Sequence, residues 1–443
     1  MFEAERPEGR AVARVLLDSA LPQLDHLFDY AVPDDLAGEL RAGQRVRVPF
    51  RSQSRRSHGY VIGFAERSDF AGELQPIAEI VGPVPVLQPE IWRLAREVAD
   101  RAAGSACDIL RLAIPTRMVR VEKQYLAAGG DADGVAAGAA AGAADPPAFS
   151  ASDDEAEAAD LLTAGARLAV TASHGPERLG TGEWVGGWAV RLARLALAVH
   201  ARGRSAIAVL PDYRDLDQLR DALSALGHPD PVRVDSRQPN GERYAAFLRA
   251  LDPVPRIVIG NRSAVYAPAH RLGAILVWDD GDPVLAEPLA PYAHARDAAL
   301  VRASLGGTGE SDEAIGLLFA AHTRSAEVQR LVDIGYVQPE RVPPRRTRVQ
   351  HSDASVAPDA FAGRVPEFAA RAIREGLRTG PVLVQVASPG YAPSRSAPTA
   401  ASSRGAGPAP GRSASAPRAA PPAAGAASRR TGGAAVTAAA GGS

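Results

Sequence analysis

Unbroken apolar runs alternate with helix-like stretches from residue 161 to residue 387, and this alternation restricts the fold more than any other feature. Residues 212–226 form a helical pattern that ends at Gly227. The apolar runs on either side of it suit strands that are covered on both faces, as in a parallel sheet. They are RLAVT (167–171), SAIAVLP (205–211), RIVIG (256–260) and GAILVWDD (273–280). We therefore expect an α/β domain built on a parallel sheet.

Two tryptophans belong to the expected core of this domain. Trp184, Trp188, Leu192, Leu195 and Val199 recur at the spacing of one helix face. Because aromatic residues at this spacing are core residues more often than functional ones, we expect both tryptophans to be buried.

The region before the α/β domain has a different pattern. Residues 11–87 contain short apolar or alternating runs broken by Pro, Gly and Asp, which predicts a small β-barrel. Residues 88–126 are expected to form a helical connection. Residues 127–160 consist mainly of Ala, Gly, Asp and Glu, so we expect an acidic disordered linker.

Composition excludes several classes of protein. The 443 residues suffice for two or three domains, and their net charge is −1. The single cysteine, Cys107, excludes a disulfide framework and a cysteine-based zinc site. No apolar run reaches about 18 residues, and the first ten residues lack a signal pattern. We expect a cytoplasmic protein with no membrane partner.

Three aspartates mark the expected site of the α/β domain. Asp279, Asp280 and Asp282 follow the apolar run that ends at Trp278. In sheets of this kind, ligands bind outside the carboxyl ends of the strands. Paired carboxylates at such a place can hold Mg²⁺. The alternative is a solvated acidic turn with Trp278 packed beneath it.

The residues that bind a nucleotide's phosphates are missing. A phosphate-binding loop needs close backbone approach, a Lys for the β- and γ-phosphates, and a Ser or Thr for Mg²⁺. The corresponding segment, residues 167–194, has glycines but no G-K-[ST], and Lys123 is the one lysine of the chain. An arginine fork does not replace a compact ammonium group. We therefore expect no catalytic residues and no ATP hydrolysis, although binding of ATP without turnover stays open.

These segments resemble the primosomal replication-restart helicases of superfamily 2. That family has an I-V-I-G-T-R-S-A turn, an Asp-Glu-Glu-His box and a P-R-Y-x-A-R-D segment. Here the turn survives as Ile257–Ala264 and the last segment as Pro291–Asp297, while the box reads Trp278-Asp279-Asp280-Gly281-Asp282. A Trp thus stands where the family has the Asp that holds Mg²⁺. The pattern resembles the actinobacterial branch, which is regarded as lacking helicase activity.

The resemblance implies a degenerate RecA-like helicase lobe over residues 161–340 and the start of a second lobe over 341–387. The family has a cysteine-rich zinc-binding stretch in its second lobe, and this chain has no such cysteines. Residues 388–443 are rich in Ala, Pro, Gly, Ser and Arg. They are expected to be a disordered basic tail, and a frameshifted or truncated product is the hypothesis we weigh against a genuine tail.

The N-terminal region also resembles this family, in the domain that captures the 3′ end of a nascent DNA strand. Phe28 and Asp29 match the residues that stack on the terminal base and accept from its edge and the 3′-OH. Their alternative roles are a barrel core residue and a turn former. The family's Gly and Lys are replaced by Arg51 and Gln75, which puts the end-specific pocket in doubt.

Arginines crowd one strand–loop–strand region of the expected barrel. They are expected to contact DNA phosphates, and a solvated loop tip is the alternative. A second group lies in a Pro-rich connection, where it could contact DNA or solvate a linker. The first group consists of Arg41, Arg45, Arg47, Arg51, Arg55 and Arg56, and the second of Arg341, Arg345, Arg346 and Arg348.

The resemblance implies a role in replication restart. We expect recognition of stalled or branched forks and a scaffold for reloading the replicative helicase, without helicase activity. The implied partners are forked or single-stranded DNA, single-strand-binding protein and primosome proteins. ATP and Mg²⁺ are cofactors of the family, but none is expected here. The alternatives are an active ATP-dependent 3′-to-5′ helicase with atypical motifs and an inert, partly folded fragment.

Overall fold

The fold is taken from a computed structural model, which describes residues 12–50, 52–129, 150–172, 175–306, 313–340, 365, 367–378 and 382–384. The chain divides into two compact units, Met1–Pro343 and Pro344–Ser443. The expectations for Arg51, for the arginines of the Pro-rich connection and for the tail lie outside the described residues.

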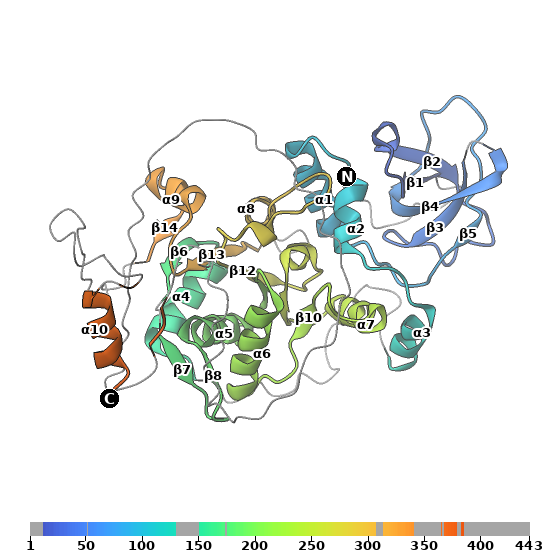
Figure 1. The fold of residues 1–443 in the computed structure, drawn as a ribbon. Coiled ribbons are helices and arrows are strands. Elements are labelled where there is room, and N and C mark those ends of the chain that lie inside the picture. The colour runs from blue at the N-terminus through green and yellow to red at the C-terminus, as the bar shows by residue number, and fades with distance from the viewer. Residues whose placement is uncertain are drawn as a thin grey trace, which may run out of the picture. The chain divides into compact units, whose positions relative to one another are not determined.

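An antiparallel sheet of five strands forms the N-terminal domain, in the order β2-β1-β4-β3-β5 (Figure 1). Ala31 of β2 bridges Pro76, just before β5, so the two edges of the sheet approach each other. Val15, Val46 and Val61 are fully buried in the core that the sheet encloses. The expected β-rich domain is thereby confirmed. Its strands are β1 (Val12–Leu17), β2 (Leu27–Ala31), β3 (Arg45–Phe50), β4 (Ser52–Ala65) and β5 (Glu79–Ile80), and the short helix η1 (Pro22–Leu24) precedes β2.

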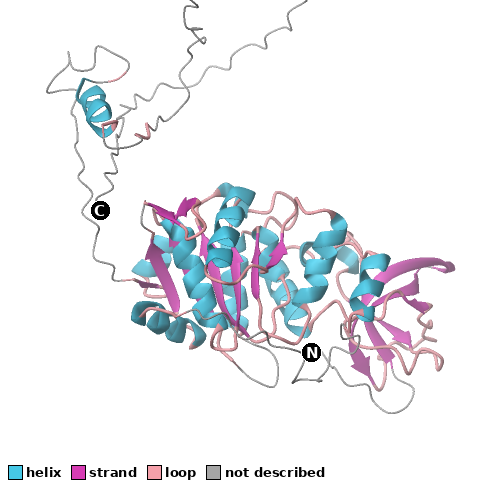
Figure 2. Ribbon diagram, turned by 90° about the horizontal axis from the view of Figure 1, so that it is seen from below, coloured by secondary structure: helices cyan, strands magenta, loops and turns pink. Residues whose placement is uncertain are grey.

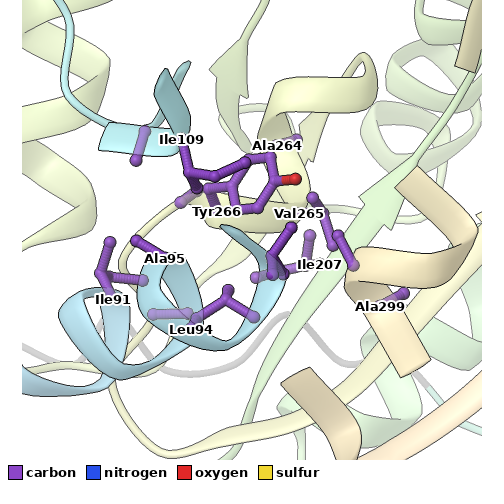
Figure 3. Close-up of a cluster of buried hydrophobic side chains, with 14 of the residues drawn as sticks. Ile91, Leu94, Ala95, Ile109, Ile207, Ala264, Val265, Tyr266 and Ala299 are labelled. Carbon is purple, nitrogen blue, oxygen red and sulfur yellow. The ribbon is translucent and has the colours of Figure 1, made fainter. Parts of the chain in front are cut away.

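Three helices connect this sheet to the α/β domain: α1 (Pro89–Arg101), α2 (Ala106–Ala113) and α3 (Val119–Ala127). Ile91 and Leu94 of α1 and Ile109 of α2 pack around Val265 and Tyr266 of the short helix η2 (Arg262–Tyr266) (Figure 3). This apolar cluster reaches from the barrel through the helices into the larger sheet. The expected helical connection is therefore part of a shared core.

A seven-stranded sheet forms the second domain, in the order β10-β11-β9-β12-β13-β6-β14. Every pairing in it is parallel. Its strands are β6 (Arg167–Thr171), β9 (Ser205–Val209), β10 (Val232–Val234), β11 (Ile257–Gly260), β12 (Leu272–Trp278), β13 (Gly316–Ala321) and β14 (Gln338–Pro339).

Helices cover both faces of this sheet (Figure 2). Alternate residues of its strands enter two separate apolar layers; Ile275 and Val277 enter one, and Leu276 and Trp278 enter the other. This explains why the strand sequences are unbroken apolar runs. The predicted α/β fold with a RecA-like lobe is confirmed. The helices are α4 (Asp153–Thr163), α5 (Gly187–His200), α6 (Tyr213–Ala225), α7 (Asn240–Ala250), α8 (Ala295–Leu305) and α9 (Ala326–Asp333), and η3 (Pro283–Leu285) follows β12.

Two expectations of the sequence analysis were wrong. Residues 153–160, expected in the linker, form the first part of α4, because Ser152 and Glu155 make a reciprocal capping box and Ala159 and Leu162 are buried. Trp184 is not on the helix that carries Trp188. It lies in a hairpin of β7 (Pro176–Arg178) and β8 (Trp184–Gly186), and it is 65% exposed.

The second unit has one helix among its described residues, α10 (Glu367–Gly376), in which Ala369 is buried and Arg374 pairs with Glu367. No helix in the described parts of the chain is long and apolar enough to cross a membrane.

Candidate functional site

A pair of stacked tryptophans lies at the carboxyl end of β12. Trp278, the last residue of β12, is 4% exposed. Its ring stacks on that of Trp188 with the centroids 4.1 Å apart and the planes 10° from parallel. The His322 ring meets the Trp278 ring edge-on, with centroids 5.1 Å apart. The expectation that Trp278 packs beneath the acidic turn is confirmed.

Trp188 belongs to the first turn of α5, where a helix presents free amide groups to an anion. Here two of those amides already have partners. The N–H of Gly186 donates to Oε1 of Gln218 (2.7 Å), and the N–H of Gly187 donates to the carbonyl of Gly175 (2.9 Å). A Cβ atom on Gly186 would lie 2.3 Å from Nε1 of Trp188. The indole ring therefore folds back over the start of α5, where a phosphate would sit.

The three predicted aspartates have different surroundings. Asp280 is buried, receives a hydrogen bond from the Ser325 hydroxyl (2.6 Å) and lies 3.3 Å from the Arg296 guanidinium. Asp282 accepts from the N–H of Val284 and starts η3. Asp279 adopts a left-handed backbone with φ 48°. Asp280 and Asp282 thus act as structural anchors, and Asp280 is not the solvated group of the alternative interpretation.

The remaining carboxylates at this edge repel one another. Partial burial raises the pKa of Asp279, and the negative charges of Asp282 and Asp280 raise it further. Burial, with the neighbouring charge of Asp212, raises the pKa of Asp215 in α6 to about 6. Among the described residues, no three His, Cys, Asp or Glu side chains are arranged to hold a metal ion.

Phe28 and Asp29, the residues predicted to bind the strand end, point to opposite faces of β2, as neighbours in a strand do. Phe28 packs on the inner core of the barrel, against Phe50 (5.8 Å between centroids) and His26 (4.2 Å). Asp29 lies on the other face, directly opposite Arg14 of β1. The Ser68 hydroxyl donates to Oδ2 of Asp29 at 2.5 Å.

The four arginines of the predicted cluster whose side chains the structure describes have different surroundings. Arg45 donates to the carbonyl of Pro115 (2.8 Å), and its guanidinium lies 5.9 Å from the Tyr60 ring centroid, so it joins β3 to the helical connection. Arg47 pairs with Glu79 (2.5 Å). Arg41 donates to the carbonyls of Gly38 and Leu40, whereas Arg56 is exposed. A role of Arg45 and Arg47 in binding DNA stays a prediction.

Comparison with known proteins agrees with this arrangement. Residues 14–115 match the family model of the 3′ DNA-binding domain (3′BD) of PriA. A protein of Mycobacterium tuberculosis called "Probable replication restart protein PriA" is 37% identical over 388 residues, which are 85% of this chain and 55% of that protein. The chain belongs to the PriA family. The similar protein of Mycobacterium leprae is 35% identical over 392 residues, 85% of this chain and 56% of that protein. The chain thus spans about half the length of the PriA relatives it matches.

More distant PriA proteins match over shorter stretches. Replication restart protein PriA of Bacillus subtilis is 30% identical over 120 residues, 27% of this chain and 15% of that protein. Among solved structures, RecG bound to a three-way DNA junction aligns with 59% of this chain and 31% of that chain, at 11% identity and a TM-score of 0.28. That score carries no argument about this chain.

The match to the PriA domain covers β1 through α2 and so includes Arg14, Asp29 and Ser68. Of these, the sequence analysis singled out Asp29 alone. Arg14 interrupts the apolar run VARVLL and could have been noticed as a polar residue of a strand. Ser68 lies in a polar loop, and nothing local distinguishes it.

Proposed function

We propose that this chain is a DNA-binding protein of replication restart that recognises stalled or branched forks through a 3′ strand end and does not hydrolyse ATP. It scaffolds assembly of the primosome and reloading of the replicative helicase, with single-strand-binding protein and primosome proteins as partners. Membership of the PriA family supports the setting, and the match of residues 14–115 supports DNA-end binding. The stacked pair Trp188–Trp278 carries the rest of the proposal.

The tryptophan pair argues against turnover of ATP for two reasons. Trp188 packs against Gly186 at the start of α5, and the N–H groups of Gly186 and Gly187 already donate within the protein. The pair also places an indole where a carboxylate would hold Mg²⁺ through water. Removing one preorganised group that stabilises transferring charge typically costs about 3–4 kcal/mol in the barrier. Here the lysine, the metal-binding carboxylate and the open helix start are replaced together.

Two measurements on the full chain test the proposal. The first compares binding to a fork with a free 3′ leading-strand end and to the same fork without that strand. We expect the first fork to bind more tightly. The second measures phosphate release from ATP with and without forked DNA, and we expect none above a buffer control.

The two halves of the proposal fail separately. Equal affinity for both forks would remove the DNA-end role. DNA-stimulated phosphate release that co-purifies with the protein would show an active motor instead. To exclude a contaminating ATPase, the Trp278→Arg variant serves as a control, because a bulky charge beside Trp188 would abolish turnover by this chain but not by an impurity.

A further inference from the structure

A polar site surrounds Asp29 on the outer face of the β1–β2 edge. Arg14 of β1 pairs in register with Asp29 of β2, so their side chains project from the same face of the sheet. Directly opposed residues of an antiparallel pair have Cβ atoms about 4.5–5.5 Å apart. Arg14 is half-buried. Among the residues that the structure describes, none forms a hydrogen bond or ion pair with its guanidinium.

The Asp29 carboxylate is held in one orientation. The Ser68 hydroxyl donates to Oδ2 at 2.5 Å, a length typical of a charge-assisted bond. The bond from Ser68 ties the loop after β4 to β2, and the same Ser68 oxygen accepts from the N–H of Phe70 at 3.1 Å. The loop is tied again by the N–H of Ala31, which donates to the carbonyl of Gln75 (3.0 Å). One carboxylate oxygen of Asp29 thus remains available to a ligand.

Phe70 belongs to the same loop as Ser68, whose hydroxyl holds this carboxylate. It is 65% exposed, and its ring lies over Gly72, where a Cβ atom would approach within 2.6 Å of the ring. An exposed aromatic ring in this loop offers a stacking surface for a base. The site therefore combines a guanidinium, a fixed carboxylate and an exposed ring within two strands and one loop.

We propose that Arg14, Ser68 and Phe70 complete the 3′-end site around Asp29, with Arg14 binding the phosphate next to the terminal nucleotide. This inference rests on the proposed DNA-end function. Ser68 fixes Asp29 so that its free oxygen accepts a hydrogen bond from the terminal 3′-OH, and Phe70 stacks on the terminal base. The arginine fork matches two phosphate oxygens, which a lone carboxylate would repel. A 3′-phosphate would place negative charge against Asp29, so the site favours a 3′-OH end.

The test measures binding of the full chain to three forks: one with a 3′-OH leading strand, one with a 3′-phosphate and one without the leading strand. Arg14→Gln is expected to weaken binding to the 3′-OH fork about tenfold, the usual effect of losing one charge-assisted contact. It should also reduce the slope of log affinity against log salt by about one unit. Ser68→Ala is expected to reduce the discrimination between 3′-OH and 3′-phosphate ends, because Asp29 is released. Phe70→Leu should weaken binding to both ended forks.

Arg93→Gln is the matched control, because it removes one charge from an exposed position of α1 in the helical connection, within the stretch that matches the PriA domain model. It is expected to leave preference for the ended fork unchanged. Arg14→Lys keeps the charge without the fork and should bind with intermediate affinity, which separates loss of a contact from loss of the fold.

The binding data for wild type and Arg14→Gln separate the assignment of Arg14 from the proposed function. If wild type prefers the ended fork and Arg14→Gln binds it equally well, the assignment of Arg14 is wrong and the proposed function stands. If Arg14→Gln weakens binding to all three forks equally, its contact is not at the strand end, and the inference fails. If wild type shows no preference for a 3′ end, the proposed function and the inference fail together.

Discussion

Trp184 and Trp188 are four residues apart and have opposite environments, because Trp188 is buried against Trp278 and Trp184 is exposed. Trp278→Ala removes one ring of the buried Trp188–Trp278 stack. We expect it to cost about 3–5 kcal/mol of unfolding free energy, because a large aromatic leaves a cavity that the sheet cannot fill. Trp184 is 65% exposed in the hairpin. Trp184→Ala is therefore the matched control, expected to change stability by less than about 0.5 kcal/mol.

Urea unfolding followed by circular dichroism measures both variants. Equal destabilisation by the two changes would contradict the burial of Trp188 and Trp278. We also expect no ATP turnover from Trp278→Ala, because Gly186 and Gly187 keep the protein partners of their N–H groups and the chain's one lysine is Lys123.

Asp215 gives a dependence of stability on pH. Its pKa in the fold is about 6, against an ordinary value of 3.8, chiefly because of burial. A raised pKa means that the fold holds the proton more tightly than the unfolded chain does. This contribution is complete below about pH 4 and is lost as the pH rises through about 6. At pH 7.5 the Asp215 carboxylate is ionised, and its burial and its acidic neighbours then destabilise the fold.

Asp215→Asn should therefore stabilise the protein more at pH 7.5 than at pH 4.5. Since Asp215 is partly exposed, we expect the change between the two pH values to be about 1 kcal/mol after screening by solvent. Asp221→Asn on the same helix is the control, because Asp221 pairs with Arg220 instead. A pH-independent effect of Asp215→Asn would refute the raised pKa.

The predictability of the sites differs from residue to residue. Asp29 and Trp278 could be singled out because each stands in a local motif. Arg14 and Ser68 could not be linked to Asp29, because their proximity depends on the register of β1 with β2 and on a loop 39 residues further along the chain. The opposite directions of Phe28 and Asp29 follow from strand alternation and could have been predicted once residues 27–31 were placed in a strand.

At the scale of elements, α3 is joined to α7 by a buried carboxylate. Glu122 accepts from the Arg117 guanidinium (2.6 Å) and from the Tyr244 hydroxyl (2.6 Å), and its side chain is 3% exposed. The Tyr244 ring is fully buried. Glu122→Ala leaves a charge and a hydroxyl without their partner, so we expect a loss of about 3–5 kcal/mol.

Tyr244→Phe is the control for this pair. It removes one hydrogen bond while Arg117 still satisfies the carboxylate, so a loss of about 1 kcal/mol is expected. Urea unfolding of both variants and of the double variant gives the coupling between them. A loss below 1 kcal/mol for Glu122→Ala would mean that α3 does not depend on this network.

Periodicity located most elements but not their boundaries. The helix at 187–200 was predicted correctly, yet the same spacing extended one turn too far and included Trp184. The hairpin before it depends on a turn at Gly182, where φ is 96°, and on pairing of Glu177 with Val185. The start of α4 was missed because its acidic, Ala-rich sequence resembles a linker, although Ser152 and Glu155 form a capping box.

At the scale of the first unit, one apolar cluster runs from the barrel to the larger sheet. It begins at Leu16 and Tyr60, continues through α1 and α2, and ends among residues of β12 and β13. Polar contacts cross the same boundary, since Tyr125 donates to Asp252 (2.7 Å) and Tyr244 to Glu122. The β-rich N-terminal domain is thus continuous with the α/β lobe, so a ligand bound to one of them is expected to change the stability of the other.

This continuity predicts that residues 12–129 and 150–340 stay together when the chain between them is cut. A protease recognition site inserted between residues 130 and 149 allows the cut after folding. A complex that persists at about 1 µM needs a binding free energy of about −8 kcal/mol. The shared core is expected to exceed this, so gel filtration should give one peak that contains both pieces.

Leu94→Ala lies in the middle of the cluster and should cost about 2–5 kcal/mol, enough to separate the pieces at that concentration. Two peaks from the cut chain without this substitution would show that the helical connection does not hold the domains together.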